Sequence, residues 1–428
     1  MSRVALGLAI LLAVAAAAAA ALIVLPAPSK SLAFLAIGAG EKSAFVVAAA
    51  VLAAVLTLIG MGPGTRLVAT CAILLCLGAV VVGLIPLAQA LRLASEQRVD
   101  LDFDRYLRAG ADTEGPIAAA RTVTYATVQG RPLGLDVYVP AGPPAQPTRA
   151  IVVAHGGGWS AGDKGDASRA SQWFASQGFT IFDVEYRTAP QPNWRTATGD
   201  VKCAIGWIKR HAVTADWNVD PRKITLLGRS AGGHLALLAA YAPADPRLPA
   251  SCADAGDTSV ESVVAFYAPT DLVWGYAHPA RPRVYDSSEK LRQFIGGPPE
   301  TTGDLYRMLS PSERVTAGSP RTLLIHGGRD QFIGRQHVDL LTEKLNAAGV
   351  RYDTLIIPYA QHGFDFLFGG FSGQIAEAVI LRFLNAAPEA TSPANVPTGT
   401  DGGGDALAAD AGGAEARPAD TTDRGDDR

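Results

Sequence analysis

The chain has 428 residues, of which 48% are hydrophobic and 18% are charged, so it is more apolar than an ordinary soluble protein. Its net charge of −3 and its four cysteines exclude a strongly basic nucleic-acid binder and a dense disulfide scaffold. The average conceals three regions, because residues 1–91 carry only five charged side chains, whereas residues 388–428 carry nine acids and three arginines.

The first 91 residues contain three long uncharged stretches, at residues 4–29, 43–65 and 67–91. Each is long enough to cross a lipid bilayer as a helix, which takes about 20 residues. We therefore predict a multi-pass membrane region with transmembrane helices over about 4–26, 43–61 and 67–89. Residues 31–40 are too short to cross and are expected at the membrane interface or as an extension of the second helix. For the first stretch alone, a signal peptide is the alternative.

Two features of the sequence bear on which side of the membrane the rest of the chain lies. The count of basic residues near the three stretches favours a cytoplasmic position, because the reverse orientation leaves only Arg3 and Arg66 in the cytoplasm. Cys203 and Cys252 favour the other side if they form a disulfide, which requires an oxidising compartment. Two separate buried thiols are the alternative, so the sequence leaves the side of the membrane open.

After an expected linker over residues 92–118, the pattern changes to short strands and helices over 119–387. Residues 122–128 and 133–139 alternate around Gly130 and predict an antiparallel hairpin. Short apolar runs, typical of strands buried in a parallel sheet, follow at 150–154, 179–184, 223–227, 260–266, 321–325 and 352–357. Helical stretches separate them at 167–177, 199–211, 232–241, 335–348 and 373–385. The order predicts an α/β fold with a mostly parallel sheet and helices on both faces.

Two further segments are set apart by their composition. Residues 272–320 separate two of the predicted core strands and contain five aromatic residues, so we expect a small cap over the pocket. Residues 388–428 are low in hydrophobic residues and rich in Gly, Ala and Asp. Such a tail cannot bury enough apolar surface to offset the entropy of ordering, and we expect it to be disordered.

Ser230 is the candidate nucleophile. It lies in the sequence GRSAG, which follows the predicted strand over 223–227 and opens an apolar helix. Because reacting groups in such sheets lie at the carboxyl ends of strands, this context predicts a nucleophile elbow. The glycine run at 156–158 follows another strand, and Gly157, Gly158 and Ala231 are the expected backbone donors of an oxyanion hole. His155 is expected to orient this loop.

A serine hydroxyl needs a base, and the base needs a group that fixes its tautomer. His362, after the last predicted strand, is the candidate base, and Asp330, just past the strand over 321–325, is the candidate acid. The order Ser230, Asp330, His362 is that expected of an α/β-hydrolase. Asp365 is the alternative acid, and a structural role is the alternative for His362. With no metal cluster, phosphate loop or dinucleotide fingerprint in the sequence, we expect no cofactor and no metal.

Taken together, residues 122–385 resemble α/β-hydrolase fold serine esterases. The nearest groups are the hormone-sensitive-lipase-like carboxylesterases, the feruloyl-esterase-like BD-FAE family and the kynurenine-formamidase-like hydrolases. The motifs that carry the resemblance are His155-Gly-Gly-Gly-Trp159, Gly228-Arg-Ser-Ala-Gly232, His326-Gly-Gly-Arg-Asp330 and His362-Gly363. Arg229 and His234 depart from the lipase-like pattern, which favours the feruloyl-esterase-like branch.

The resemblance implies a carboxylesterase that cleaves a small-molecule ester through an acyl-enzyme on Ser230. The composition and motifs add a membrane anchor in the lipid bilayer, no cofactor and no nucleic acid as a partner. The same three residues would also serve an amide, formamide or peptide hydrolase. An inactive hydrolase fold that binds without cleaving is the alternative from another class.

Overall fold

The structure is a computed structural model that describes residues 3–109, 119, 121–142, 146–212 and 217–386. The predicted disordered tail over 388–428 lies outside these residues, as do residues 110–118 of the predicted linker. The described residues from Arg3 onward belong to one compact unit.

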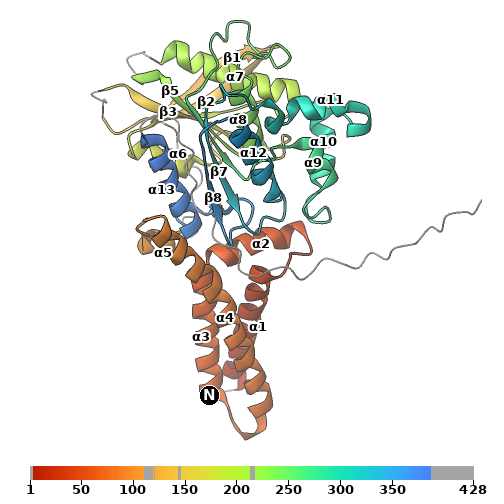
Figure 1. The fold of residues 1–428 in the computed structure, drawn as a ribbon. Coiled ribbons are helices and arrows are strands. Elements are labelled where there is room, and N and C mark those ends of the chain that lie inside the picture. The colour runs from red at the N-terminus through yellow and green to blue at the C-terminus, as the bar shows by residue number, and fades with distance from the viewer. Residues whose placement is uncertain (1–2, 110–118, 120, 143–145, 213–216, 387–428) are drawn as a thin grey trace, which may run out of the picture. The chain divides into compact units, whose positions relative to one another are not determined.

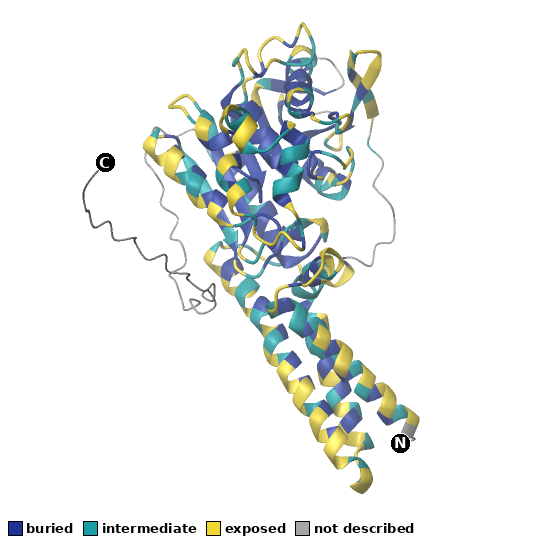
Figure 2. Ribbon diagram, turned by 90° about the vertical axis from the view of Figure 1, so that its right-hand side faces the viewer, coloured by how far each residue is buried: buried dark blue, intermediate teal, exposed yellow. Residues whose placement is uncertain are grey.

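Three long helices form the N-terminal bundle: α1 (Arg3–Val24), α3 (Ser43–Gly60) and α4 (Arg66–Glu96). They lie side by side in both views (Figures 1 and 2). Small residues such as Ala13, Ala50 and Ala72 are buried where the helices meet, and Figure 2 shows exposed residues along their outer faces. Each helix is long and apolar enough to cross a membrane. The small buried residues let the helix backbones approach closely, as in membrane bundles.

Shorter helices lie between and after these three. The residues expected at the interface form a separate helix, α2 (Lys30–Glu41), which begins where the Ser29 side chain accepts the N–H of Leu32. A short turn, η1 (Pro63–Thr65), joins α3 to α4, and α5 (Phe103–Arg108) follows α4. Helix α4 runs past the predicted end at residue 89, because Leu93 in its last turns packs into the core of the following domain.

A single eight-stranded sheet organises the following domain. Its strands are β1 (Arg121–Val128), β2 (Arg131–Tyr138), β3 (Thr148–Ala154), β4 (Thr180–Val184), β5 (Val219–Arg229), β6 (Ser262–Phe266), β7 (Arg321–Gly327) and β8 (Tyr352–Ile357). Their spatial order is β1-β2-β4-β3-β5-β6-β7-β8. The β1–β2 and β2–β4 pairs are antiparallel and the others are parallel. The predicted hairpin and the mostly parallel sheet are therefore confirmed.

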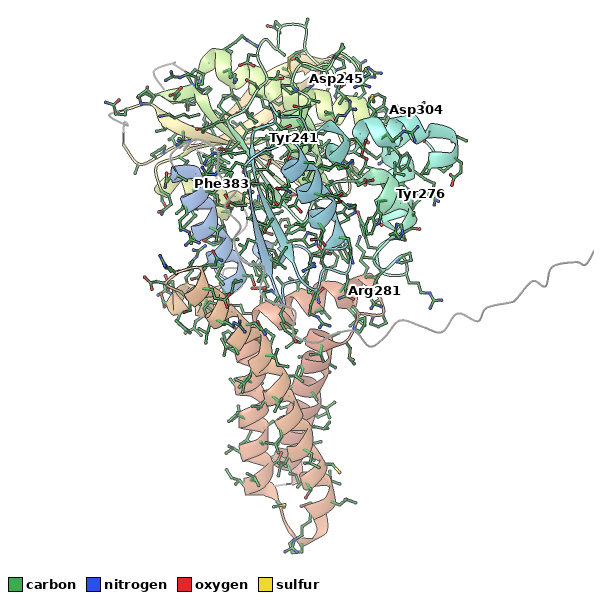
Figure 3. The ribbon with its side chains drawn as sticks, viewed as in Figure 1. Tyr241, Asp245, Tyr276, Arg281, Asp304 and Phe383 are labelled. Atoms are coloured by element: carbon green, nitrogen blue, oxygen red, sulfur yellow. A yellow bond between two sulfur atoms is a disulfide. The ribbon has the colours of Figure 1, made fainter. Side chains whose placement is uncertain are left out.

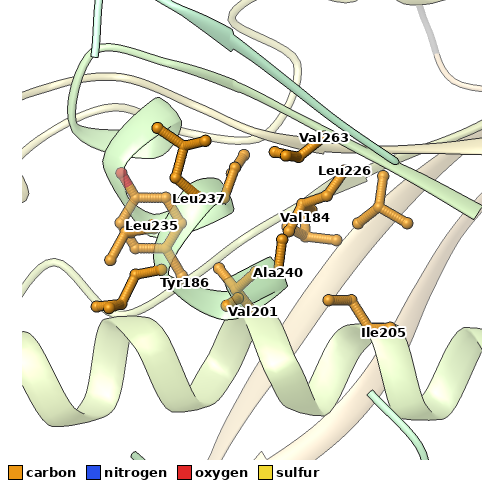
Figure 4. Close-up of a cluster of buried hydrophobic side chains, with 14 of the residues drawn as sticks. Val184, Tyr186, Val201, Ile205, Leu226, Leu235, Leu237, Ala240 and Val263 are labelled. Atoms are coloured by element: carbon orange, nitrogen blue, oxygen red, sulfur yellow. The ribbon is translucent and has the colours of Figure 1, made fainter. Parts of the chain in front are cut away.

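Helices cover both faces of the sheet (Figure 1). One face packs against α7 (Trp194–His211), α8 (Ala231–Tyr241) and α12 (Gln336–Ala347). The other packs against α6 (Ser168–Ser176), α13 (Phe371–Asn385) and the end of α4. Figure 4 shows the first of these cores, where Val201 and Ile205 of α7 and Leu235 of α8 lie near Leu226 and Val263 of the sheet. Burial on both faces explains why the parallel strands are apolar without alternation.

Residues 272–320, where we expected a cap, lie between β6 and β7. They include α9 (Leu272–Ala277), α10 (Ser287–Ile295), α11 (Pro299–Leu309) and the turn η2 (Pro311–Arg314). Figure 3 shows Tyr276 and Asp304 on this segment. Aromatic residues pack its helices together, since the ring of Tyr276 meets that of Tyr306 edge to face at 5.6 Å.

The two cysteines of this domain form a disulfide. Cys203 of α7 is bonded to Cys252, which precedes β6, with a Cα–Cα distance of 5.7 Å. The sequence left open a disulfide or two separate thiols, and the structure has the disulfide.

Candidate active site

Ser230 lies in a sharp turn between β5 and α8. Its backbone has φ 55° and ψ −120°, a conformation that costs energy in a residue with a side chain and is typical of functional sites. The N–H of Ser230 donates to the carbonyl of Phe266, which fixes the turn to the neighbouring strand β6. A Cβ atom on Gly228 or on Gly232 would lie 2.2 Å from a backbone oxygen. The glycines on either side of the serine are therefore required by the close approach of the chain.

The structure brings the three residues proposed from the sequence together. His362 follows β8, and its Nε2 lies 3.0 Å from Ser230 Oγ. Its Nδ1 lies 2.7 Å from Oδ2 of Asp330, which follows β7. The arrangement places a base within reach of the hydroxyl proton and a carboxylate behind the base.

Asp330 is fully buried, yet its surroundings favour the ionised carboxylate. The N–H groups of Phe332 and Ile333 donate to its Oδ1, at 2.8 and 2.9 Å. Burial by itself would raise the pKa of Asp330, but the charge of His362 and its hydrogen bond hold that pKa below the usual value. An ionised Asp330 accepts the Nδ1–H of His362 and leaves Nε2 free to accept a proton from the serine.

The glycine loop after β3 lies beside the nucleophile. Gly158 and Ala231 line the same pocket as Ser230. Gly157 precedes them in a tight turn with φ +114°, in which its carbonyl accepts the N–H of Ala161. Nδ1 of His155 lies 2.8 Å from the carbonyl oxygen of Gly156, at the start of this loop. The imidazole also stacks on the ring of Tyr186, at 4.1 Å.

His234, which departs from the lipase-like pattern, connects the glycine loop to the segment between β6 and β7. Its Nε2 lies 2.8 Å from the carbonyl oxygen of Leu309, and its Nδ1 accepts the indole N–H of Trp159 at 3.2 Å. Burial lowers the pKa of His234 to about 4, which keeps the ring neutral and allows one nitrogen to accept. The ring of Phe294 in α10 stacks on Trp159 at 4.6 Å. His234 therefore holds the glycine loop in place and does not act as the catalytic base.

Asp365, the alternative acid, forms its hydrogen bonds with residues other than His362. Its carboxylate lies 2.5 Å from Nε of Arg229 and accepts the hydroxyl of Tyr267 at the same distance. Arg229, the second departure from the lipase-like pattern, thereby gains its ion partner.

A pocket lies above Ser230. It is formed by the glycine loop, the segment between β6 and β7 and the loop after β7. Its lining residues include Asp271, His278, Tyr285, Leu291, Phe332 and Ile333. Apolar and aromatic side chains dominate this set, which suits an organic substrate with an apolar portion.

The N-terminal segment also reaches the loops of this site, a contact that we did not predict from the sequence. The N–H of Ala27, between α1 and α2, donates to Oε1 of Gln331 at 2.8 Å. Nε2 of Gln331 donates in turn to Oε1 of Gln361, which precedes the base. The guanidinium of Arg329 donates to the carbonyl of Val24, the last residue of α1. The loops that carry Asp330 and His362 are thus both linked to the end of α1, and no local motif predicts pairs more than 300 residues apart.

This geometry agrees with comparisons to known proteins. Residues 135–345 match the BD-FAE family model. The fold matches Thermogutta terrifontis esterase 2 phosphonylated by sarin, with 28% identity, a TM-score of 0.53 and coverage of 64% of this chain and 98% of that one. The domain has the α/β-hydrolase fold and is similar to esterases. The butyrate-bound form of the same esterase gives a TM-score of 0.52 at 28% identity, covering 64% of this chain and 97% of that one.

Two relatives from Mycobacterium tuberculosis extend the similarity. "Esterase LipC" is 35% identical over 261 residues, which cover 59% of this chain and 61% of that protein. "Probable carboxylic ester hydrolase LipM" is 31% identical over 234 residues, which cover 52% of this chain and 51% of that protein. The chain thus spans about half to three fifths of the length of these relatives.

Proposed function

We propose that the chain is a serine hydrolase that cleaves carboxylic esters through an acyl-enzyme on Ser230. The single observation that carries the proposal is the chain of contacts from Ser230 Oγ to His362 Nε2, at 3.0 Å, and from His362 Nδ1 to Asp330, at 2.7 Å. The esterase relatives support ester rather than amide substrates.

In the first step, Ser230 Oγ attacks the ester carbonyl carbon while His362 Nε2 takes the hydroxyl proton. The negative charge that develops on the carbonyl oxygen is stabilised by the backbone N–H groups of Gly157, Gly158 and Ala231. The alcohol leaves with the proton from His362, and the acyl group stays on Ser230. Water then attacks the acyl carbon with His362 again as base, which releases the carboxylic acid. Asp330 stabilises the imidazolium at each step.

The experiment is Ser230→Ala in the full chain, purified in detergent and assayed with p-nitrophenyl butyrate. We expect turnover to fall by a factor on the order of 10⁴ to 10⁶ and labelling by a fluorophosphonate probe to disappear. Ser176→Ala, which removes an exposed serine at the end of α6, is the control and should change neither. Undiminished turnover in the Ser230 variant would exclude this serine as the nucleophile.

We further propose that α1, α3 and α4 anchor the enzyme in a membrane with the catalytic domain on its oxidising side. Helix length and composition support the anchoring. The Cys203–Cys252 disulfide supports the side, because such bonds persist in oxidising compartments. It outweighs the basic-residue count, since large domains translocate largely regardless of charge.

Protease treatment of intact spheroplasts that express the full chain tests the side. We expect the catalytic domain to be digested without lysis, and Cys203 and Cys252 to react with a maleimide only after reduction. A domain that is protected until lysis would place it in the cytoplasm.

A further inference from the structure

One wall of the active-site pocket is also the surface against which the N-terminal helices pack. Tyr285, Phe332 and Ile333 line the pocket above Ser230. The same residues belong to a hydrophobic cluster with Ala27 and Ala33, at the junction of α1 and α2. Only one layer of apolar side chains therefore separates the pocket from this junction.

Aromatic rings continue this layer from α2 to the base. The ring of Phe34 meets that of Phe332 edge to face at 5.8 Å, and Phe332 in turn lies 5.1 Å from the imidazole of His362. Phe332 also stacks on Tyr285 at 4.9 Å. At α2 the side chains at the end of this series lie on the surface, since Phe34 is 54% exposed and its neighbour Leu35 is 60% exposed. Exposed apolar side chains of this size on one short helix indicate a surface that is covered by something other than water.

The position of α2 along the bundle identifies what covers it. Helix α2 lies between the end of α1 at Val24 and the start of α3 at Ser43, and both of these helices are proposed to cross the membrane. It therefore lies at the level where the hydrocarbon core gives way to lipid headgroups. Exposed Lys30 at the start of α2 and exposed Arg281 in the cap segment near α2 in Figure 3 have the charge that suits phospholipid headgroups.

We propose that the substrate is an ester lipid resident in the bilayer, and that its apolar chain reaches Ser230 along Phe34 and Phe332 without passing through water. The inference rests on the proposed esterase function and adds the substrate class. The physical reason is continuity: Phe34 on the exposed face of α2 contacts Phe332, and Phe332 lines the pocket, so apolar side chains connect the two.

The experiment compares two substrates on the full chain in nanodiscs. One is a phospholipid with a fluorogenic long acyl ester within the disc, and the other is soluble p-nitrophenyl butyrate. We expect the ratio of the bilayer rate to the soluble rate to fall about tenfold or more for Phe34→Ala. The matched control is Phe103→Ala, since Phe103 in α5 is also 54% exposed but packs against Phe371 instead. Its ratio should match that of the wild type.

Phe34→Leu keeps an apolar side chain of similar size, so its ratio of bilayer rate to soluble rate should stay close to that of the wild type. A decrease in this ratio for Phe34→Ala but not for Phe34→Leu supports the route. Equal ratios for Phe34→Ala and Phe103→Ala would overturn it. A wild type that cleaves the soluble ester and leaves the bilayer ester intact would overturn the substrate class while the esterase function stands. Failure on both substrates, with no fluorophosphonate labelling, would instead reject the esterase function and the inference with it.

Discussion

Arg229 and Asp365 form a buried ion pair that joins the residue before the nucleophile to the loop after the base. Nε of Arg229 lies 2.5 Å from Asp365, and the two side chains are only 6% and 8% exposed. Because Arg229 is adjacent to Ser230 and Asp365 lies three residues after His362, the pair fixes both loops to each other. It also gives Arg229, which departs from the lipase-like pattern, a buried partner of opposite charge.

Asp365→Asn should destabilise the protein strongly, because it leaves the Arg229 charge buried without a partner. Removal of one member of a buried pair typically costs about 3–5 kcal/mol. For a domain of this size that corresponds to a decrease in Tm on the order of 10 °C, measurable by thermal unfolding in detergent.

Asp304→Asn is the control for this change. It breaks the pair between Arg307 and Asp304, whose side chains are 60% and 97% exposed, and should lower stability by less than about 1 kcal/mol. Equal decreases in stability for the two substitutions would show that the buried pair contributes no more to stability than the exposed one.

Gly157→Ala should reduce kcat for p-nitrophenyl butyrate by a factor on the order of 10² to 10³, as expected when an oxyanion loop is displaced. A Cβ at this position would lie 2.0 Å from the carbonyl oxygen of Ala161, so the loop must move. Gly178→Ala is the matched control, because Gly178 also has a positive φ, of 92°, but has open space around its Cβ position. A similar loss of kcat in both variants would attribute the effect to backbone strain alone.

Asp183 should make the stability of the protein depend on pH. It is buried in β4 with its carboxylate oxygens 2.9 and 3.0 Å from Ser171 Oγ. Burial raises the pKa of Asp183 to about 7, although the hydrogen bond from Ser171 and the charge of Arg229 oppose the shift. The folded state therefore keeps this proton while the unfolded state loses it, so stability falls as pH rises from about 4 to about 7.

The contribution of Asp183 amounts to at most about 4 kcal/mol over that range. Asp183→Asn removes the titrating proton and keeps the shape, so its Tm relative to the wild type should rise with pH over this range. Asp339→Asn, at an exposed carboxyl, should show a constant difference from the wild type. A constant difference for Asp183→Asn as well would mean that its carboxyl titrates normally.

Much of the catalytic domain could be predicted because its information is local. Each strand is a short apolar run, and each candidate site residue follows such a run directly, so the α/β order places Ser230, Asp330 and His362 at one edge of the sheet. The hairpin from β1 to β2 was predictable for the same reason, since alternation and a turn glycine lie within a few residues. The three N-terminal helices followed from length and hydrophobicity alone.

Contacts between distant parts of the chain were decided only by the tertiary structure. The pairing of Cys203 with Cys252, the ion pair of Arg229 with Asp365 and the hydrogen bond from Ala27 to Gln331 each join residues 49 or more positions apart. No periodicity or motif encodes such a pair, because its partners meet only when the sheet, the helices and the bundle have packed. The sequence by itself therefore determined the fold class and the chain order of the candidate site residues, and the packing decided that the loops of Asp330 and His362 contact the N-terminal segment.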